Sequence, residues 1–202
     1  MDSELDAEAA EFLRPARVFS REEVLTRPSP VPAANGVYGW WFRSVPPLID
    51  ASRCTRRSGL ALLYVGISPR EPPADGGPAS GQNLRKRLRQ HYARTAEAST
   101  LRRTLGCLLA GDLGLELRRV GSTGRRTTFA AGERILSDWM ADNAFVNWVV
   151  QDQPWRLEEE LIRRLELPLN LRGNAGSRSL ALVTQARARC LIHARNLPVL
   201  PR

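Results

Sequence analysis

Two short stretches of β-branched and aromatic residues most constrain the fold of this chain. Residues 36–42 read GVYGWWF, and residues 60–68 read LALLYVGIS. Residues of these types favour strands, and each stretch has the length of a single strand. The second stretch is almost continuously apolar, which is typical of a buried strand. The chain is therefore expected to contain a small sheet that includes these two strands.

Helical patterns alternate with further strand patterns in the rest of the chain. Ser20, with Glu23 three residues later, has the pattern of a capping box for a brief helical turn. Asn83 and Ser99 each precede a predicted helix, at residues 84–96 and 100–111, and their side chains are suited to cap it. We expect further strands at 113–121, 125–129 and 144–151, and helices at 131–143, from 154 onwards and at 180–196. A Gly-Ser-Thr-Gly turn at 121–124 would join the first two of these strands, and loops are expected at 69–82 and 167–179. The sequence thus predicts a mixed α/β (α+β) fold with a small, mostly antiparallel sheet flanked by helices. In the helix 131–143 the inward residues are predicted to be Ile135, Leu136, Trp139 and Met140.

One glutamate lies on the wrong face of its predicted helix. At about 100° per residue, Leu157, Leu161, Ile162 and Leu165 form one apolar stripe, which is expected to face the core. Glu158 falls inside this stripe, whereas the two glutamates that follow it fall outside. Burial of an unpaired charge costs several kcal/mol, so a cation, a metal ion or a water-filled cleft is expected beside Glu158.

The predicted helix after the second strand also has polar side chains beside its apolar stripe, in this case an arginine and a histidine. Leu84 and Leu88 mark its core side, and Arg87 and His91 border that side one turn apart. Each alone is compatible with a structural role, since an arginine can extend its charge to the surface and a histidine can be satisfied in a core. Together with an inward Glu158, they suggest a phosphodiester site in which the carboxylate holds a metal and the cations hold the phosphate.

The charge of the chain favours a polyanionic partner. The net charge is +9, while residues 1–30 carry seven acidic residues and four arginines, a net charge of −3. The remaining residues therefore carry +12, which favours nucleic acid. Lys86 is the only lysine, and this preference for arginine is also what a GC-rich genome would produce. The residues predicted to contact nucleic acid are Arg85, Lys86, Arg89, Arg187 and Arg189.

Several of these residues occur in an order that resembles the GIY-YIG nuclease family. GVY, which ends at Tyr38, stands where the family has Gly-Ile-Tyr, and YVG, which begins at Tyr64, stands where it has Tyr-Ile-Gly. Arg87 and His91 match the family's catalytic helix. EEELIRRLELPLN resembles the segment that supplies a metal-binding glutamate, Glu158, and a later asparagine. The resemblance covers residues 36–170.

The resemblance implies metal-dependent hydrolysis of phosphodiester bonds in DNA. It implies that Glu158 binds one divalent ion, Mg²⁺ or Mn²⁺, and that Arg87 steadies the phosphate and the charge that develops on it. RNA is not excluded as the nucleic acid. One alternative is a non-catalytic module that binds nucleic acid with the same fold. Another is a protein-interaction domain whose acidic N-terminus covers its own basic surface.

The resemblance also implies roles for the other four residues. Tyr38 or Tyr64 would position or deprotonate the attacking water, and which of the two acts as base is open. Because a tyrosine normally titrates near 10, such a base would need a lowered pKa, for which a nearby cation is one source. His91 would transfer protons or bind phosphate. Asn170 would tether its loop and help to organise the site.

The chain departs from the minimal family pattern through insertions, expected at 43–59, 69–82 and 99–150. We expect an acidic N-terminal extension at 1–30, the nuclease-like domain at 31–175, and a basic C-terminal helix at 176–202 packed on the same domain. Glu133, at the edge of an apolar stripe in the last insertion, is the second candidate for the metal-binding carboxylate. Insertions of this kind commonly determine the choice of substrate.

The remaining features concern cellular location. The chain has three cysteines, at 54, 107 and 190, in no zinc-binding or disulfide pattern, which suggests reduced thiols and a cytoplasmic protein. No apolar run approaches the roughly 20 residues of a membrane span, and the start of the chain lacks a signal-peptide pattern. Membrane partners are therefore not expected, and the sequence does not indicate a protein partner.

Overall fold

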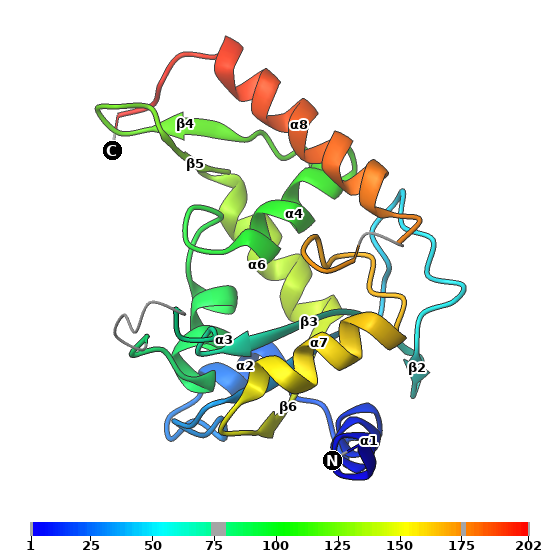
Figure 1. Ribbon diagram of the computed structural model, residues 1–202. Coiled ribbons are helices and arrows are strands. Elements are labelled where there is room, and N and C mark those ends of the chain that lie inside the picture. Colours follow the sequence, from blue (N-terminus) through cyan, green and yellow to red (C-terminus); the bar gives the residue numbers. More distant parts are fainter. Residues whose placement is uncertain (1, 74–79, 175–176, 202) are drawn as a thin grey trace.

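The chain folds into a mixed α/β structure with an antiparallel sheet flanked by helices, as predicted (Figure 1). The computed structural model describes residues 2–73, 80–174 and 177–201. In these ranges the elements follow one another as α1 (Asp2–Leu13), α2 (Arg21–Leu25), β1 (Gly36–Phe42), β2 (Arg56–Arg57), β3 (Leu60–Ser68), α3 (Leu84–Ala93), α4 (Thr100–Leu108), α5 (Ala110–Leu113), β4 (Arg118–Val120), β5 (Arg126–Thr128), α6 (Gly132–Asn143), β6 (Ala144–Val150), α7 (Pro154–Arg164) and α8 (Leu180–Asn196).

The main sheet has four strands in the order β2-β3-β1-β6, and all its pairs are antiparallel. The central strand β1 pairs with both β3 and β6, so the first two strands recognised in the sequence are neighbours. The connector 43–59 between them contains the short strand β2, which pairs with the start of β3. Strands β4 and β5 form a separate two-stranded ribbon.

An irregularity in β3 changes which side chains share a face of the sheet. Trp40 pairs with Tyr64, but the next residue, Trp41, pairs with Leu62, so Leu63 is an extra residue in the ladder. Leu63 and Tyr64 consequently both contact the same core, although successive residues of a regular strand face opposite sides. Tyr64 shares the face of Tyr38 because the ladder is regular from the Tyr38–Gly66 pair to the Trp40–Tyr64 pair, and the bulge brings Leu63 onto this face as well.

Two cores cover the two faces of the sheet. One face packs against buried residues of α3, α4, α6 and α8, and includes Tyr38 and Trp40. The other face packs against α1 and α7, and includes Val37 and Trp41. Helix α8 and the β4–β5 ribbon lie at the end of the molecule away from the four-stranded sheet (Figure 1). The catalytic candidates on α3 and α7 thus approach the sheet from opposite sides.

The acidic N-terminal segment is built into this fold. The side chains of Phe12 and Val24 are fully buried, one in each core. Asn147 on β6 accepts a hydrogen bond from Trp41 Nε1 (2.7 Å) and donates one to the carbonyl of Phe12 (2.9 Å). Helix α1 is therefore anchored to the sheet by both apolar packing and a buried amide.

Most predicted elements are present, with two differences. Ser20, Asn83 and Ser99 cap their helices, and the β4–β5 ribbon turns through residues 121–124 as the sequence suggested. The strand predicted over 113–121 is limited to β4, since Leu113 belongs to α5 and residues 114–117 are in neither a helix nor a strand. Ile135 is 43% exposed, so the inward position predicted for it is wrong. The loops predicted around 69–82 and 167–179 fall partly on residues outside the described ranges.

No helix in the described ranges has both the length and the apolar character to cross a membrane.

Candidate active site

The two tyrosines of the strand motifs lie together on one face of the sheet. Their ring centroids are 6.4 Å apart. Tyr38 is fully buried, whereas Tyr64 is partly exposed. Gly66 pairs with Tyr38 across the sheet, and a Cβ atom at this position would approach Tyr38 Oη to 2.7 Å and the Tyr64 ring to 2.9 Å. The glycine of the YVG motif is thus needed because the two rings occupy the space of its missing side chain.

Helix α3 brings Arg87 and His91 to Tyr38. Asn83 caps the helix by accepting a hydrogen bond from Lys86 N (2.9 Å), and the buried Leu84 orients the helix against the core. Arg87 Nε then donates to Tyr38 Oη (3.3 Å), and Tyr38 Oη is 3.0 Å from His91 Nε2. The pairing of arginine and histidine on one helix flank, predicted from the sequence, therefore produces contacts to a single tyrosine hydroxyl.

His91 is completely buried and uncharged. Its ring has 0% exposed area, with Tyr38 on Nε2 and Ser99 Oγ on Nδ1 at 2.7 Å. Burial, reinforced by the positive charges of Arg87 and Arg102, holds the pKa of His91 well below 6.5. A side chain that is enclosed in this way has no free nitrogen for a phosphate. Of the two roles expected for His91, only proton exchange is compatible with this arrangement.

Neither tyrosine has the lowered pKa that a base role would require. Burial raises the pKa of Tyr38, although the charge of Arg87 and its hydrogen bond act in the opposite direction. The pKa of Tyr64 is raised well above 10, chiefly by burial and further by the neighbouring Tyr38 hydroxyl and the charge of Glu158. Both hydroxyls are therefore protonated in the resting protein, and each is able to donate a hydrogen bond.

Glu158 acts electrostatically on both tyrosines: its negative charge raises the pKa of Tyr38 and of Tyr64. The buried Leu157 and Leu161 fix α7 in the second core, and Glu158 is partly buried beside them. Burial raises the pKa of Glu158 to about 7, and the charge of Arg70, which sequence reasoning did not single out, partly opposes this shift. Among the described residues Glu158 has no hydrogen-bond or ion-pair partner. The uncompensated inward carboxylate expected from the helical projection is therefore present.

The other candidate carboxylate, Glu133, is fully engaged elsewhere. One of its oxygens accepts hydrogen bonds from Ala96 N, Phe129 N and Thr128 Oγ1, at 2.8 to 3.1 Å. The other oxygen pairs with the guanidinium of Arg102 at 2.9 Å. Because all its lone pairs are directed at donors, Glu133 is a structural group, and Glu158 remains the candidate metal ligand.

Asn170 supports the site through hydrogen bonds to the backbone of β3. Its Oδ1 accepts a hydrogen bond from Val65 N (2.9 Å), and its Nδ2 donates one to Val65 O (2.8 Å). Both groups are buried. Val65 follows Tyr64, so this double hydrogen bond fixes the backbone of β3 next to the bulge. Asn170 does not contact the hydroxyl groups of the site.

Replacement of Asn170 by alanine is expected to lower the free energy of unfolding by about 2 to 3 kcal/mol, because two buried backbone groups lose their partner. Urea unfolding followed by circular dichroism measures this change. Asn143→Ala, which removes a single hydrogen bond to Trp139 O, is the control and should cost about 1 kcal/mol or less. Equal losses in the two variants would contradict a bracing role for Asn170.

The cations predicted to bind nucleic acid form two separate groups. Arg85, Lys86 and Arg89 lie on α3 with Arg87, and Arg187 and Arg189 lie on α8, at the other end of the molecule (Figure 1). Two of the α3 side chains contact the protein itself, since Arg85 Nε donates to Val31 O (2.6 Å) and Lys86 Nζ to Gly81 O (2.8 Å). The group on α3 is adjacent to the candidate site, whereas the group on α8 is not.

The described part of the chain contains no cluster of three or more histidine, cysteine or carboxylate side chains suited to a metal. A divalent ion at this site would therefore have Glu158 as its protein ligand. This fits Mg²⁺, which prefers oxygen ligands and commonly binds one or two carboxylates together with water and substrate phosphates. The partly buried Glu158 carboxylate without a hydrogen-bond donor provides such a ligand.

Comparison with known protein families agrees with this fold. The family model described as the GIY-YIG catalytic domain matches residues 36–189, which is more than half of the chain. The chain therefore belongs to the GIY-YIG family, a superfamily of nucleases. No curated protein and no solved structure matches it at a significant level.

Proposed function

We propose that the protein is a metal-dependent endonuclease that hydrolyses phosphodiester bonds in DNA. The observation that carries the proposal is the partly buried Glu158, which has no hydrogen-bond or ion-pair partner among the described residues and whose charge raises the pKa of both Tyr38 and Tyr64. Membership of a nuclease family supports the reaction type. The net charge of +9 supports a nucleic acid as substrate.

Glu158 is the proposed ligand of a single Mg²⁺ or Mn²⁺ ion. Such an ion, when bound, would stabilise the charge on the scissile phosphate and favour ionisation of water. The raised pKa of Glu158 means that the ion competes with a proton for the carboxylate. Metal binding is therefore expected to weaken as the pH falls below about 7.

Arg87 is the proposed phosphate ligand. Its Nε is held by Tyr38, so the guanidinium is oriented before the substrate binds, which lowers the reorganisation needed in the transition state. Arg87 is partly exposed and is therefore accessible to DNA. The cations on α3 that flank it, Arg85, Lys86 and Arg89, would contact neighbouring phosphates, and Arg187 and Arg189 would contact a more distant part of a long substrate.

The tyrosines and His91 are the proposed route for the proton of the attacking water. Tyr64 is the partly exposed member and would contact the water. As the water oxygen bonds to phosphorus, its proton passes to Tyr64, the Tyr64 proton to Tyr38, and the Tyr38 proton to His91 Nε2. The bond to the leaving oxygen breaks, and that oxygen takes a proton from solvent. The negative phosphate beside Arg87 offsets one of the two cations that disfavour protonation of His91.

The proposal is tested with supercoiled plasmid and Mg²⁺. We expect the wild-type protein to nick the plasmid, and EDTA or the Glu158→Gln substitution to prevent nicking. Retention of the plasmid on a gel is measured in parallel at increasing salt. Salt-sensitive retention without nicking of DNA or of a structured RNA would favour the alternative, a binding module on the same fold, and would reject the endonuclease.

A further inference from the structure

We propose that the β4–β5 ribbon is a second DNA-binding surface, which contacts phosphates of the duplex outside the cleavage site. The ribbon lies beside α8, at the end of the molecule away from the four-stranded sheet, whereas the candidate site is formed by that sheet, α3 and α7 (Figure 1). The choice of DNA as the partner rests on the function proposed above. The surface itself does not, because a non-catalytic module that binds DNA would use it as well.

The ribbon carries a high density of positive charge. Residues 117–132 contain four arginines and no acidic residue. Arg125 and Arg126 follow the turn and are exposed, and the turn itself, residues 121–124, exposes a serine and a threonine. Arg126 pairs with Glu97 at 3.1 Å, but both side chains are partly exposed to water, so the pair contributes little to stability and a phosphate can replace it. Arginine and hydroxyl side chains are common ligands of DNA phosphates.

The other two arginines of the ribbon fix its position. Arg119 donates three hydrogen bonds, at 2.9 to 3.1 Å, to carbonyls at the end of α8, those of Ala194, Arg195 and Leu197. Arg118 donates to the carbonyl of Pro198 (3.1 Å). Beyond α8, Leu200 N donates to Arg119 O (2.9 Å), and Gly121 N donates to Leu200 O (3.1 Å). The chain after α8 thus lies along β4, and the ribbon is held in one orientation before a partner binds, which lowers the entropic cost of binding.

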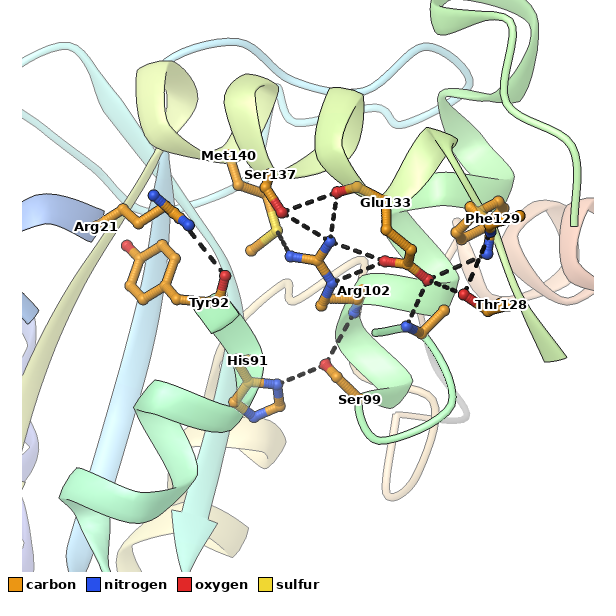
Figure 2. Close-up of polar contacts among 12 residues, drawn as sticks. Arg21, His91, Tyr92, Ser99, Arg102, Thr128, Phe129, Glu133, Ser137 and Met140 are labelled. Carbon is orange, nitrogen blue, oxygen red and sulfur yellow. Dashed lines mark hydrogen bonds and ion pairs between the residues drawn. The ribbon is translucent and has the colours of Figure 1, made fainter. Parts of the chain in front are cut away.

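Glu133 links the base of the ribbon to the candidate site. One of its carboxylate oxygens accepts a hydrogen bond from Thr128 Oγ1 (2.8 Å), at the end of β5, and the other pairs with the guanidinium of Arg102 (2.9 Å). The backbone N–H of Arg102 donates to Ser99 Oγ (3.1 Å), which is 2.7 Å from His91 Nδ1. Figure 2 shows these contacts as one network between the end of β5 and His91. The ribbon and helix α3 are thereby held at a fixed separation.

Contacts to phosphates have a characteristic salt dependence. Each phosphate that a protein neutralises releases condensed counterions, so the slope of the logarithm of affinity against the logarithm of salt concentration changes by roughly 0.9 per contact. Arg125 and Arg126 should therefore contribute roughly 1 to 2 to this slope. Arg187 and Arg189, which were predicted from the sequence to contact nucleic acid, lie on the neighbouring α8, so the ribbon extends that group of cations.

The test compares matched pairs of adjacent, exposed arginines. Binding of a labelled DNA duplex of about 30 base pairs is measured by fluorescence anisotropy in EDTA, so that metal-dependent cleavage does not occur. Arg125→Gln/Arg126→Gln should lower the affinity at least about fivefold at about 0.1 M salt and reduce the salt slope by about 1 to 2. Arg125→Lys/Arg126→Lys keeps both charges and should keep the slope. The control, Arg56→Gln/Arg57→Gln, removes the same charge from the exposed strand β2 and should change the affinity less than about twofold.

Equal losses in the ribbon variant and the β2 variant would overturn the proposal, because net charge alone would then account for binding. Unchanged affinity of the ribbon variant, or no DNA binding by the wild-type protein, would overturn it as well. Circular dichroism verifies that each variant is folded. Nicking of supercoiled plasmid with Mg²⁺ is measured separately, and the ribbon variant should retain kcat with a raised KM. If no protein nicks the plasmid but the ribbon variant loses binding, the endonuclease is rejected and the binding surface stands.

Discussion

Replacement of Glu158 by glutamine is expected to abolish metal-dependent cleavage, with a loss of about 10³-fold or more, and at the same time to stabilise the metal-free protein. The activity is lost because a neutral amide is a poor ligand for Mg²⁺ and leaves the phosphate charge uncompensated. The stability gain follows from burial, which raises the pKa of Glu158 from 4.5 in the reference state to about 7 in the folded protein.

The sign of the stability change depends on pH. A raised folded-state pKa contributes stability that is fully present below pH 4.5 and is lost as the pH rises through about 7. At about pH 8 the folded protein therefore contains a penalised carboxylate, which Glu158→Gln removes. After allowance for partial exposure, we expect the free energy of unfolding to rise by about 1 to 2 kcal/mol. The lowered pKa of His91 decreases stability as the pH falls below 6.5. His91 is present in both the wild-type protein and the Glu158→Gln variant, so this effect does not contribute to the difference between them.

Urea unfolding at about pH 5 and pH 8, with and without Mg²⁺, measures both effects. Mg²⁺ should stabilise the wild-type protein and leave Glu158→Gln unchanged. Glu159→Gln is the matched control, since Glu159 is the exposed neighbour on the same helix, and it should retain cleavage and respond to Mg²⁺. Normal nicking by Glu158→Gln would reject Glu158 as the metal ligand.

Replacement of Arg102 by methionine is expected to lower the free energy of unfolding by about 3 to 5 kcal/mol. Methionine has a similar length but leaves the carboxylate of Glu133 in a mostly buried position without its cation. The loss should be smaller in the double variant Arg102→Met/Glu133→Gln, because glutamine keeps an oxygen for the N–H groups of Ala96 and Phe129 and carries no charge.

A double-mutant cycle by urea unfolding isolates the pair from the rest of the network. The control is Arg163→Met, which removes one of the two exposed arginine partners of Glu160 on α7 and should change stability little. Additive effects of the Arg102 and Glu133 substitutions would show that the two side chains do not depend on each other.

Much of the fold could be predicted because its signals are local in the sequence. Ser20, Asn83 and Ser99 were identified as caps from residue type and position, and the structure has these hydrogen bonds. The two strand patterns correspond to β1 and β3. Ile135 was misplaced because the predicted apolar stripe covers more residues than α6 buries, and the partners that decide burial come from elsewhere in the chain.

Some features of the candidate site could also be predicted from local sequence signals, whereas others could not. Helical periodicity identified Glu158, and one-turn spacing identified Arg87 and His91 as neighbours. The bulge in β3 had no recognisable signal, yet it places Leu63 on the same face of the sheet as Tyr64. The contact of Ser99 with His91 was also missed. The sequence identifies Ser99 only as the cap of the helix that follows it, and its contact with a residue of another helix depends on the tertiary structure.

The sequence by itself therefore determined the element types, the candidate residues and the family resemblance, all of which depend on residue type and short-range spacing. Only the tertiary structure decided the protonation states of the site. Burial raises the pKa values of Glu158, Tyr38 and Tyr64 and lowers that of His91. The physical reason is that desolvation and charge–charge interactions depend on how chain segments far apart in the sequence enclose a group, which no local pattern specifies.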